Sequence, residues 1–193
     1  IRWLQENYKV DVITLTADLG NIGDMDEIKQ RAIDTKAIAA EVRDGRNEFL
    51  MDFVWPALQA NALYQGIYPL ATALGRPLIA KMLVEVARLY GATMVAHGCT
   101  GKGNDQVRLD VGIASLAPDL KVLAPAREWG MTRDEEIAYA QKNGISVFNA
   151  NKQFSTDENL WGRSIEAGPL ENPWIEPPEE AYLWTKAVVD TPD

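Results

Sequence analysis

The stretch AHGCTGKGNDQVRLD, residues 96–110, links a buried strand to a helix through a glycine-rich loop. The apolar run that leads into it, residues 92–96, is typical of a short buried strand. The segment that follows, residues 105–116, has the apolar spacing of a helix. Loops of this kind bind ligands in α/β folds, because glycine lets the backbone approach a ligand closely.

The predicted helix begins at Asn104 or Asp105, and Val107, Val111 and Leu116 can share one of its faces. Its first turn offers unpaired backbone N–H groups and a partial positive charge to an anion. The alternative is an ordinary strand-to-helix turn that is capped by the Asn or the Asp. The loop also carries a Thr, a Lys and an Arg, which is more than a cap needs, so we favour a binding loop.

The rest of the chain alternates predicted strands with predicted helices. Strands are expected at residues 10–17, 37–42, 92–96, 121–124 and 145–148, and helices at residues 24–36, 47–63, 77–90, 105–116 and 132–143. Pro56 predicts a kink in the second helix, and Thr132 with Glu135 forms a capping-box pattern at the last one. Such alternation predicts an α/β fold with a Rossmann-like, mainly parallel sheet and helices on both faces.

Composition narrows the classes of function. The formal net charge of −9 argues against a nucleic-acid or anionic-membrane partner, although four basic residues could still form a local positive pocket: Arg76, Lys81, Lys102 and Arg108. No apolar run approaches the ~20 residues that span a bilayer. The single cysteine, Cys99, cannot form an internal disulfide, which suits a reducing cytoplasm.

Four segments resemble argininosuccinate synthases, the ATP-dependent ligases that join citrulline to aspartate. They are LTADLG (residues 15–20), YPLATALGRPLIAK (68–81), TGKGNDQVR (100–108) and STDENLWGRSIEAGPLENPW (155–174). They occur in the family's order and at compatible separations, so the resemblance covers nearly the whole chain.

The resemblance implies an adenine nucleotide alpha hydrolase-like fold and a division of the chain. Residues 1–165 are expected to form an ATP-pyrophosphatase-type nucleotide-binding domain, and residues 166–193 an extended arm and linker to a C-terminal domain. The family's SGGxDTS phosphate loop does not occur in the sequence. We therefore expect a piece of a longer protein, incomplete at its N-terminus, with a gap in the sheet and without ATP turnover on its own.

The resemblance also implies site residues. It assigns ATP to Ala17 and Gly98, citrulline to Tyr68, Thr72, Asn104, Arg108, Ser155 and Ser164, and aspartate to Thr100, Asn104 and Asp105. No catalytic residue and no metal ligand is assigned. His97 is interpreted as a satisfied histidine at a strand end, and Cys99 receives no catalytic role.

From the residues alone, plainer interpretations stay open. Ala17 is the kind of small residue that a strand end needs. Tyr68, Thr72 and Arg76 are spaced by four, so they share one face if the segment is a helix, and that face could simply be solvated. The two serines lie in a segment where hydroxyls usually bond to nearby backbone.

The activity that the resemblance implies is a ligation in arginine biosynthesis through a citrullyl-AMP intermediate. ATP would be a substrate, with Mg²⁺ on its phosphates, and AMP and pyrophosphate would be released. The intact protein would be a cytoplasmic homotetramer without nucleic-acid or membrane partners. Two alternatives are another ATP-pyrophosphatase of the same fold and a non-catalytic nucleotide- or amino-acid-binding module.

Overall fold

Two pairs of parallel strands carry the α/β part of the fold. In the computed structural model, which describes residues 1–20, 23–101, 103–146, 153–182 and 184–191, strand β1 (Ile13–Asp18) pairs with β2 (Ala39–Asp44), and β3 (Met94–Ala96) pairs with β4 (Lys121–Leu123). Parallel neighbours need a crossover, and each pair has a helical one. Helix α2 (Met25–Asp34) joins the first pair, and α6 (Asp105–Leu116) joins the second. The predicted α/β class and parallel pairing are confirmed.

The strands do not form one continuous sheet among the described residues, because the two parallel pairs share no ladder. A cavity of about 290 Å³ is lined from both pairs, by Ile13, Thr14 and Leu15 of β1 and by Ala96 to Gly98 at the end of β3. We call it the strand-pair cavity.

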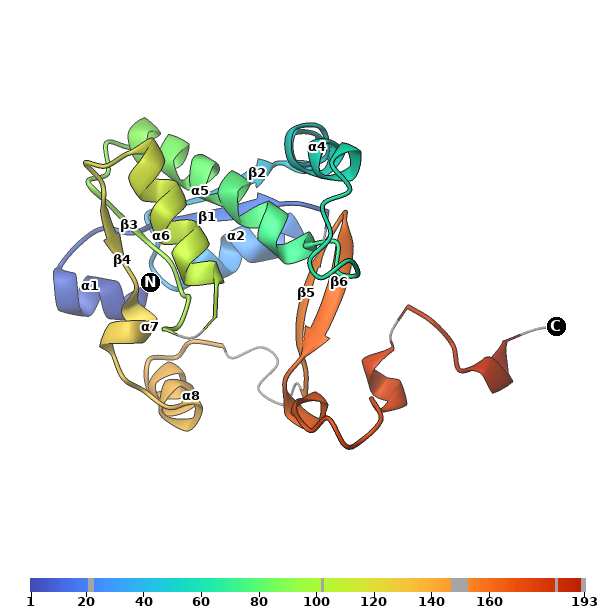
Figure 1. The fold of residues 1–193 in the computed structure, drawn as a ribbon. Helices are drawn as coiled ribbons and strands as arrows, with labels where there is room; N and C mark the ends of the chain where they lie inside the picture. The colour runs from blue at the N-terminus through green and yellow to red at the C-terminus, as the bar shows by residue number, and fades with distance from the viewer. Residues whose placement is uncertain (21–22, 102, 147–152, 183, 192–193) are drawn as a thin grey trace.

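Helix α5 (Ala71–Leu89) is the longest element and lies beside α6 (Figure 1). It begins six residues before the expected start at Pro77. A proline favours the first turn of a helix because it has no N–H, but here it lies inside one. The residues before Pro77 continue the helix because they also pack: Ala71 and Gly75 are buried.

Small residues let α5 approach its neighbours closely. A Cβ added at Gly75 would lie 2.9 Å from Leu19 Cδ1, one at Gly112 would lie 3.0 Å from Ala80 Cβ, and one at Gly162 would lie 3.3 Å from Ala71 Cβ. A side chain at Gly112 or Gly162 would therefore require α5 and its neighbour to separate by a few tenths of an ångström, whereas one at Gly75 would require the Leu19 side chain to move.

Two apolar clusters form the core on either side of α5. The first joins α5, α6 and the second strand pair through Ala80, Ala87, Val95, Leu109, Ile113, Ala117 and Leu120, and the second joins α5 to the segment after β2 through Leu19, Phe49, Val54, Leu78 and Met82. The helix at 105–116 has the predicted bounds, but its expected apolar face is wrong. Val107, Val111 and Leu116 are exposed, because the side that packs on α5 presents Leu109 and Ile113 instead.

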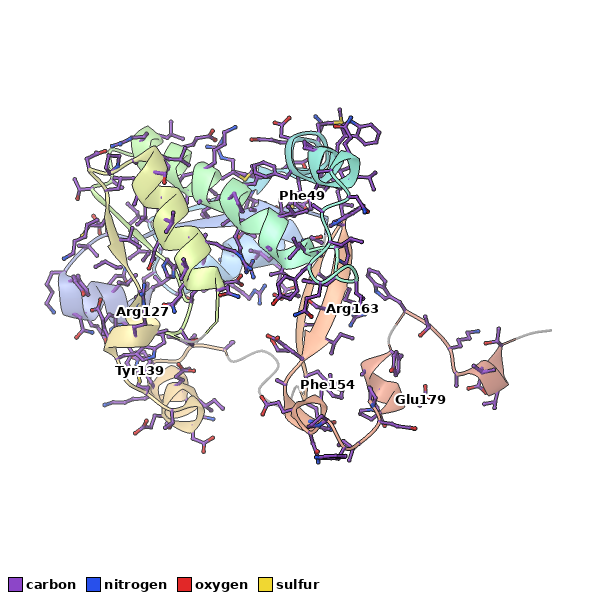
Figure 2. The ribbon with its side chains drawn as sticks, viewed as in Figure 1. Phe49, Arg127, Tyr139, Phe154, Arg163 and Glu179 are labelled. Carbon is purple, nitrogen blue, oxygen red and sulfur yellow. The ribbon has the colours of Figure 1, made fainter. Side chains whose placement is uncertain are left out.

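The predicted helix at 47–63 is broken into three parts. They are α3 (Arg46–Glu48), the π-helical segment η1 (Phe49–Val54) and α4 (Trp55–Gln59). Pro56 lies in the first turn of α4, so the predicted break is present and takes the form of a widened turn just before the proline. Phe49, labelled in Figure 2, is fully buried there.

An antiparallel hairpin, β5 (Ser155–Asn159) and β6 (Gly162–Glu166), was not predicted. Asn159 Oδ1 makes its turn by accepting from the backbone N–H groups of Trp161 (2.8 Å) and Gly162 (3.2 Å). Two side chains attach the hairpin to the start of α5. Asn159 Nδ2 donates to the Ala71 carbonyl at 2.8 Å, and Trp161 Nε1 donates to the Pro69 carbonyl at 2.8 Å.

Three further helices are α1 (Arg2–Tyr8), α7 (Pro125–Glu128) and α8 (Arg133–Lys142), and Tyr139 of α8 donates to Glu6 of α1 at 2.6 Å. The capping box at α8 is confirmed, with Thr132 and Glu135 each bonded to the other's backbone N–H. Of the strand expected at 145–148, residues 145 and 146 are not in a strand, and residues 147 and 148 lie outside the described residues.

After β6 the chain runs away from the strand pairs in three short 3₁₀ turns, η2 (Gly168–Glu171), η3 (Glu179–Ala181) and η4 (Val188–Asp190) (Figure 1). Trp174, Val188 and Val189 are each at least 90% exposed. The division of the chain at residue 165 stays a prediction. Within the described residues, none of the helices has the length and apolar character that crossing a membrane requires.

Candidate functional site

A polar cavity of about 340 Å³ lies where α5, α6 and the hairpin meet. Nine residues line it: Tyr68, Thr72, Gly103, Asn104, Asp105, Arg108, Asp157, Ser164 and Glu166. Tyr68 lies just before α5 and Thr72 in its first turn, residues 103–108 lie at and just before the start of α6, and the last three belong to the hairpin. Residues far apart in the sequence are thus brought to one place, and six of the nine are among the predicted site residues.

The Asp105 carboxylate lies between two guanidinium groups. Arg76 Nε and Nη2 reach Asp105 Oδ2 at 2.8 and 2.6 Å, and Arg108 Nη1 reaches Oδ1 at 2.8 Å. Burial acts to raise the pKa of the Asp105 carboxyl, but the hydrogen bond and charge of Arg76, joined by those of Arg108, outweigh it. The pKa is therefore below its ordinary value, and Asp105 is an anion at neutral pH.

The expected cluster of four basic residues does not form. Arg108 lines the cavity, and Arg76 contacts its lining residue Asp105 without lining it. Lys81 pairs with Glu48 at 2.5 Å and does not line the cavity, and Lys102 lies outside the described residues. Arg76 also lies 3.6 Å from Asp157 Oδ1. Among the described lining residues, three acids outnumber one arginine, so these residues do not make a positive pocket.

Two of the lining hydroxyl groups belong to Thr72 and Ser164. Thr72 Oγ1 and Ser164 Oγ are 3.5 Å apart, at the contact between α5 and β6. Tyr68 is not on the helix face expected for it, because it precedes α5 and pairs with Tyr64 in an isolated bridge. Leu70, the N-cap of α5, has φ 60°, and this left-handed residue turns the chain from Tyr68 into the helix.

Asn104 lines the polar cavity at the start of α6. It is the N-cap of α6, yet its side chain makes no capping hydrogen bond in the described part of the chain. The interpretation of the loop as an ordinary capped turn is therefore wrong for Asn104. Its amide faces the cavity, with both a donor and an acceptor to offer.

Four predicted site residues lie outside the polar cavity. Ser155 is exposed and pairs with Glu166 across the hairpin, and Thr100 is exposed in the loop after β3. Gly98 lines the strand-pair cavity, and Ala17 is in β1 opposite Arg43 and is not among the residues that line that cavity. Ala17 and Gly98 do share a setting, because both are at the C-terminal ends of parallel strands.

Sequence reasoning missed Asp157, Glu166 and Gly103 as lining residues. The two acids share a face of the hairpin with Ser164, since Asp157 is directly opposite Ser164 and Glu166 is two residues further along β6. A hairpin prediction around the Asn159–Gly162 turn would have found them, because alternate residues of paired strands point the same way.

The lining suits a ligand that carries both charges. Arg108 can bind a carboxylate, and Asp105, Asp157 and Glu166 can accept from an ammonium group. Hydroxyl and amide groups are present for a neutral polar end. No group of three or more His, Cys, Asp or Glu side chains gathers as a metal site in the residues that the structure describes.

The parallel strand pairs with their helical crossovers, and the polar cavity where α5, α6 and the hairpin meet, define an α/β domain with a polar site. Family models agree: the arginosuccinate synthase N-terminal HUP domain matches residues 1–146, and the arginosuccinate synthase C-terminal domain matches residues 154–193. The chain belongs to the argininosuccinate synthase family.

Curated relatives extend over the whole chain. An argininosuccinate synthase of Dehalococcoides mccartyi is 58% identical over all of this chain and 48% of its own length. Those of Dictyoglomus turgidum (58% identical, 96% of this chain, 47% of the relative) and Acaryochloris marina (57%, 100% and 49%) are similarly close. The chain thus spans about half the length of the curated relatives that it matches.

Proposed function

We propose that the polar cavity holds the amino-acid substrates of an ATP-dependent ligase that joins citrulline to aspartate. The observation that carries the proposal is the meeting of Arg108, Asp105, Thr72 and Ser164 from three separate segments. Such a lining offers a partner to the carboxylate, the ammonium and the polar end of an amino acid at once. Membership of the family supports the choice of citrulline and aspartate.

Each substrate receives its own set of side chains. Citrulline is proposed to contact Tyr68, Thr72, Asn104, Arg108, Ser155 and Ser164, and aspartate is proposed to contact Thr100, Asn104 and Asp105. Of these, Ser155 and Thr100 are the assignments with least support, since neither lines the cavity. ATP is proposed to lie against Ala17 and Gly98, where α/β folds bind nucleotides beyond the ends of parallel strands.

The reaction proposed is two successive displacements. The ureido oxygen of citrulline attacks the α-phosphorus of ATP and pyrophosphate leaves, which gives citrullyl-AMP. The aspartate amine then attacks the activated ureido carbon, AMP leaves, and argininosuccinate is formed. The chain contributes mainly by holding the reactants together, an effect that can supply ~7–11 kcal/mol. Mg²⁺ enters as part of the nucleotide substrate, where it neutralises phosphate charge.

The activity belongs to the whole protein in this proposal. These 193 residues contain no SGGxDTS sequence, so we expect no pyrophosphate release from them alone. Phosphates in such folds are held by a cradle of backbone N–H groups at a helix N-terminus. A homotetramer and a cytoplasmic location are proposed on the family resemblance, and sedimentation of the whole protein tests the first.

Calorimetric titration tests the amino-acid site. Citrulline and aspartate are titrated into the whole protein and into Arg108→Gln and Ser164→Ala variants, alongside an assay of pyrophosphate release. We expect both variants to bind citrulline more weakly. Arg88→Gln, which removes an exposed arginine paired with Asp119, and Ser115→Ala, which removes an exposed serine of α6, are the matched controls. Unchanged citrulline binding in both site variants would refute the assignment.

A further inference from the structure

His97 is the first residue after β3, and its environment is more specific than a strand end requires. Its backbone N–H donates to the Leu123 carbonyl at 3.1 Å, which extends the pairing of β3 with β4 by one bond. Its side chain is only 6% exposed. The backbone of His97 is therefore fixed by strand pairing and its imidazole by burial, at the point where the glycine-rich loop begins.

Both ring nitrogens of His97 have partners. Nδ1 accepts from the backbone N–H of Cys99 at 3.3 Å, and Nε2 lies 2.7 Å from Asp110 Oδ1. A nitrogen that accepts carries no proton, so the proton is on Nε2, which donates to the carboxylate. Neither nitrogen is left to take a proton from a substrate, which excludes a general-base role for this arrangement.

Asp110 also contacts α7, through Arg127. Arg127 Nη2 lies 3.1 Å from Asp110 Oδ2 and 3.4 Å from Oδ1. Burial acts to raise the pKa of the Asp110 carboxyl, but hydrogen bonds from His97 and Arg127 more than offset it, so the group is ionised. Figure 2 labels Arg127 at α7, and its Cγ is 3.9 Å from where a Cβ on Gly101 would lie. The chain of contacts thus runs beneath the loop.

The loop needs such support. Gly98, Gly101 and Gly103 lie between β3 and α6, and Gly103 has φ 86°. Glycines lose the most backbone freedom when they are ordered, so a loop rich in them is costly to hold in one shape. Besides His97 at its start, a further side chain, Gln106, bonds the loop through the Gly101 carbonyl at 2.9 Å.

We propose that His97 is a positioning residue that, with Asp110 and Arg127, holds the glycine-rich loop in its binding shape. The loop contains Gly98, Thr100 and Asn104, so, resting on the function proposed above, His97 acts on the sites for ATP and aspartate. Citrulline depends more on Tyr68, Thr72 and Ser164, which are outside the loop. Substitution of His97 should therefore weaken the binding of ATP and aspartate and have little effect on the binding of citrulline.

Two substitutions separate the two hydrogen bonds. His97→Asn keeps an acceptor near the position of Nδ1 and loses the bond to Asp110. His97→Gln keeps a donor near the position of Nε2 and loses the bond to Cys99. Asp110→Asn is a third variant that keeps size and loses charge, in case either histidine variant fails to fold. Asp119→Asn breaks an exposed Asp–Arg pair elsewhere and is the control.

Cys99 reports on the loop without any activity. It is the sole cysteine of the sequence, and burial raises the pKa of its thiol. Its reaction with a thiol reagent is therefore slow while the loop keeps this conformation. We expect labelling of the Cys99 peptide, followed by mass spectrometry, to be about tenfold faster in each His97 variant and in Asp110→Asn, as for the loss of one hydrogen bond. Equal labelling rates in these variants, the control and the unmodified protein would overturn the proposal.

Kinetics of the whole protein provide the second measurement. We expect the KM values for aspartate and ATP to rise about tenfold in the His97 variants, while the KM for citrulline changes less than about twofold. An equal rise in all three KM values would indicate general destabilisation and overturn the positioning role. If the unmodified protein has no ligase activity, the proposed function fails, and the labelling rates alone still decide whether His97 holds the loop.

Discussion

The two walls of the polar cavity are built in different ways. The helical wall, α5 and α6, is joined by an apolar cluster in which Ala80 and Ile113 are fully buried. The hairpin wall has no fully buried residue anywhere from 155 to 166, all of which the structure describes. It is held by hydrogen bonds, including those of Asn159 and Trp161 to the start of α5, and by the half-buried Trp161, which packs against the second apolar cluster.

Because the two walls are held differently, we expect them to have different roles. A wall held by buried apolar surface opens only when the domain unfolds, whereas one held by a few partly exposed hydrogen bonds opens locally at lower cost. We therefore expect the helical wall to set the positions of Asp105 and Arg108, and the hairpin to control access to them. Arg76 connects the two, because it contacts both Asp105 and Asp157.

The largest effect is expected from breaking the helical wall. Ile113→Ala leaves a cavity between α5 and α6 and should lower the free energy of unfolding by about 2–5 kcal/mol. The measurement is urea unfolding followed by circular dichroism. Val111→Ala, on the exposed side of the same helix, should change it by less than about 0.5 kcal/mol. Similar losses in both variants would mean that α6 is not buried as described.

Breaking the hairpin wall should cost less and act locally. Asn159→Ala removes the turn's acceptor and the bond to the Ala71 carbonyl, and should cost about 1–3 kcal/mol. Asn159→Asp keeps the acceptor oxygen, so its loss of stability should be smaller. Hydrogen exchange of the Trp161 and Gly162 amides should accelerate in the alanine variant, while amides of α5 stay protected. Equal acceleration in α5 would contradict a separately opening hairpin.

Arg76 connects the two walls, so its removal should weaken ligand binding more than it lowers stability. Arg76→Gln removes one of the two guanidinium partners of Asp105 and the 3.6 Å ion pair with Asp157, so we expect aspartate affinity to fall by about 1 kcal/mol, or five- to tenfold. Arg76→Lys keeps the charge but not the paired N–H geometry, so it should recover part of the loss. Calorimetry with aspartate is the measurement, and Arg88→Gln is the control. An unchanged aspartate affinity in Arg76→Gln would show that Arg76 does not contribute to aspartate binding.

The smallest effect is a dependence of stability on pH. The pKa of Asp105 is lower in the folded state than its ordinary value of about 3.9, so its ionisation favours folding. The stabilisation is fully present above that value and is lost as the pH falls through the folded-state pKa. Melting temperatures measured between about pH 6 and about pH 3 should fall less steeply in Asp105→Asn than in the unmodified protein. Parallel profiles would contradict the lowered pKa.

Local sequence signals predicted the elements that depend on local interactions. The bounds of α6 and the capping box of α8 follow from residues within one turn of each other. The buried face of α6 did not follow, because Leu109 and Ile113 face inward only through their packing on α5. The early start of α5 has the same origin, since contact with the hairpin keeps residues 71–76 helical.

The resemblance named ten candidate site residues, and six of them meet in the polar cavity: Tyr68, Thr72, Asn104, Asp105, Arg108 and Ser164. Whether they bind substrates stays a prediction. The contacts around them could not be predicted, because the pairing of Asp105 with Arg76 joins positions 29 residues apart on two helices. The acids of the hairpin were missed because a strand rich in Asp, Glu and Asn has the composition of a loop.

The close approaches of Gly75, Gly112 and Gly162 also determine which sequences this domain can tolerate. They lie at the contacts of α5 with the end of β1, with α6 and with the hairpin, and at each the nearest atom of the partner is within 3.3 Å of an added Cβ. In a library of all single substitutions, Gly112 and Gly162 should tolerate less than Gly75, because their nearest atoms are Cβ atoms fixed to the backbone of α5, whereas the tip of Leu19 can move. None of the three contributes a side chain to the cavity.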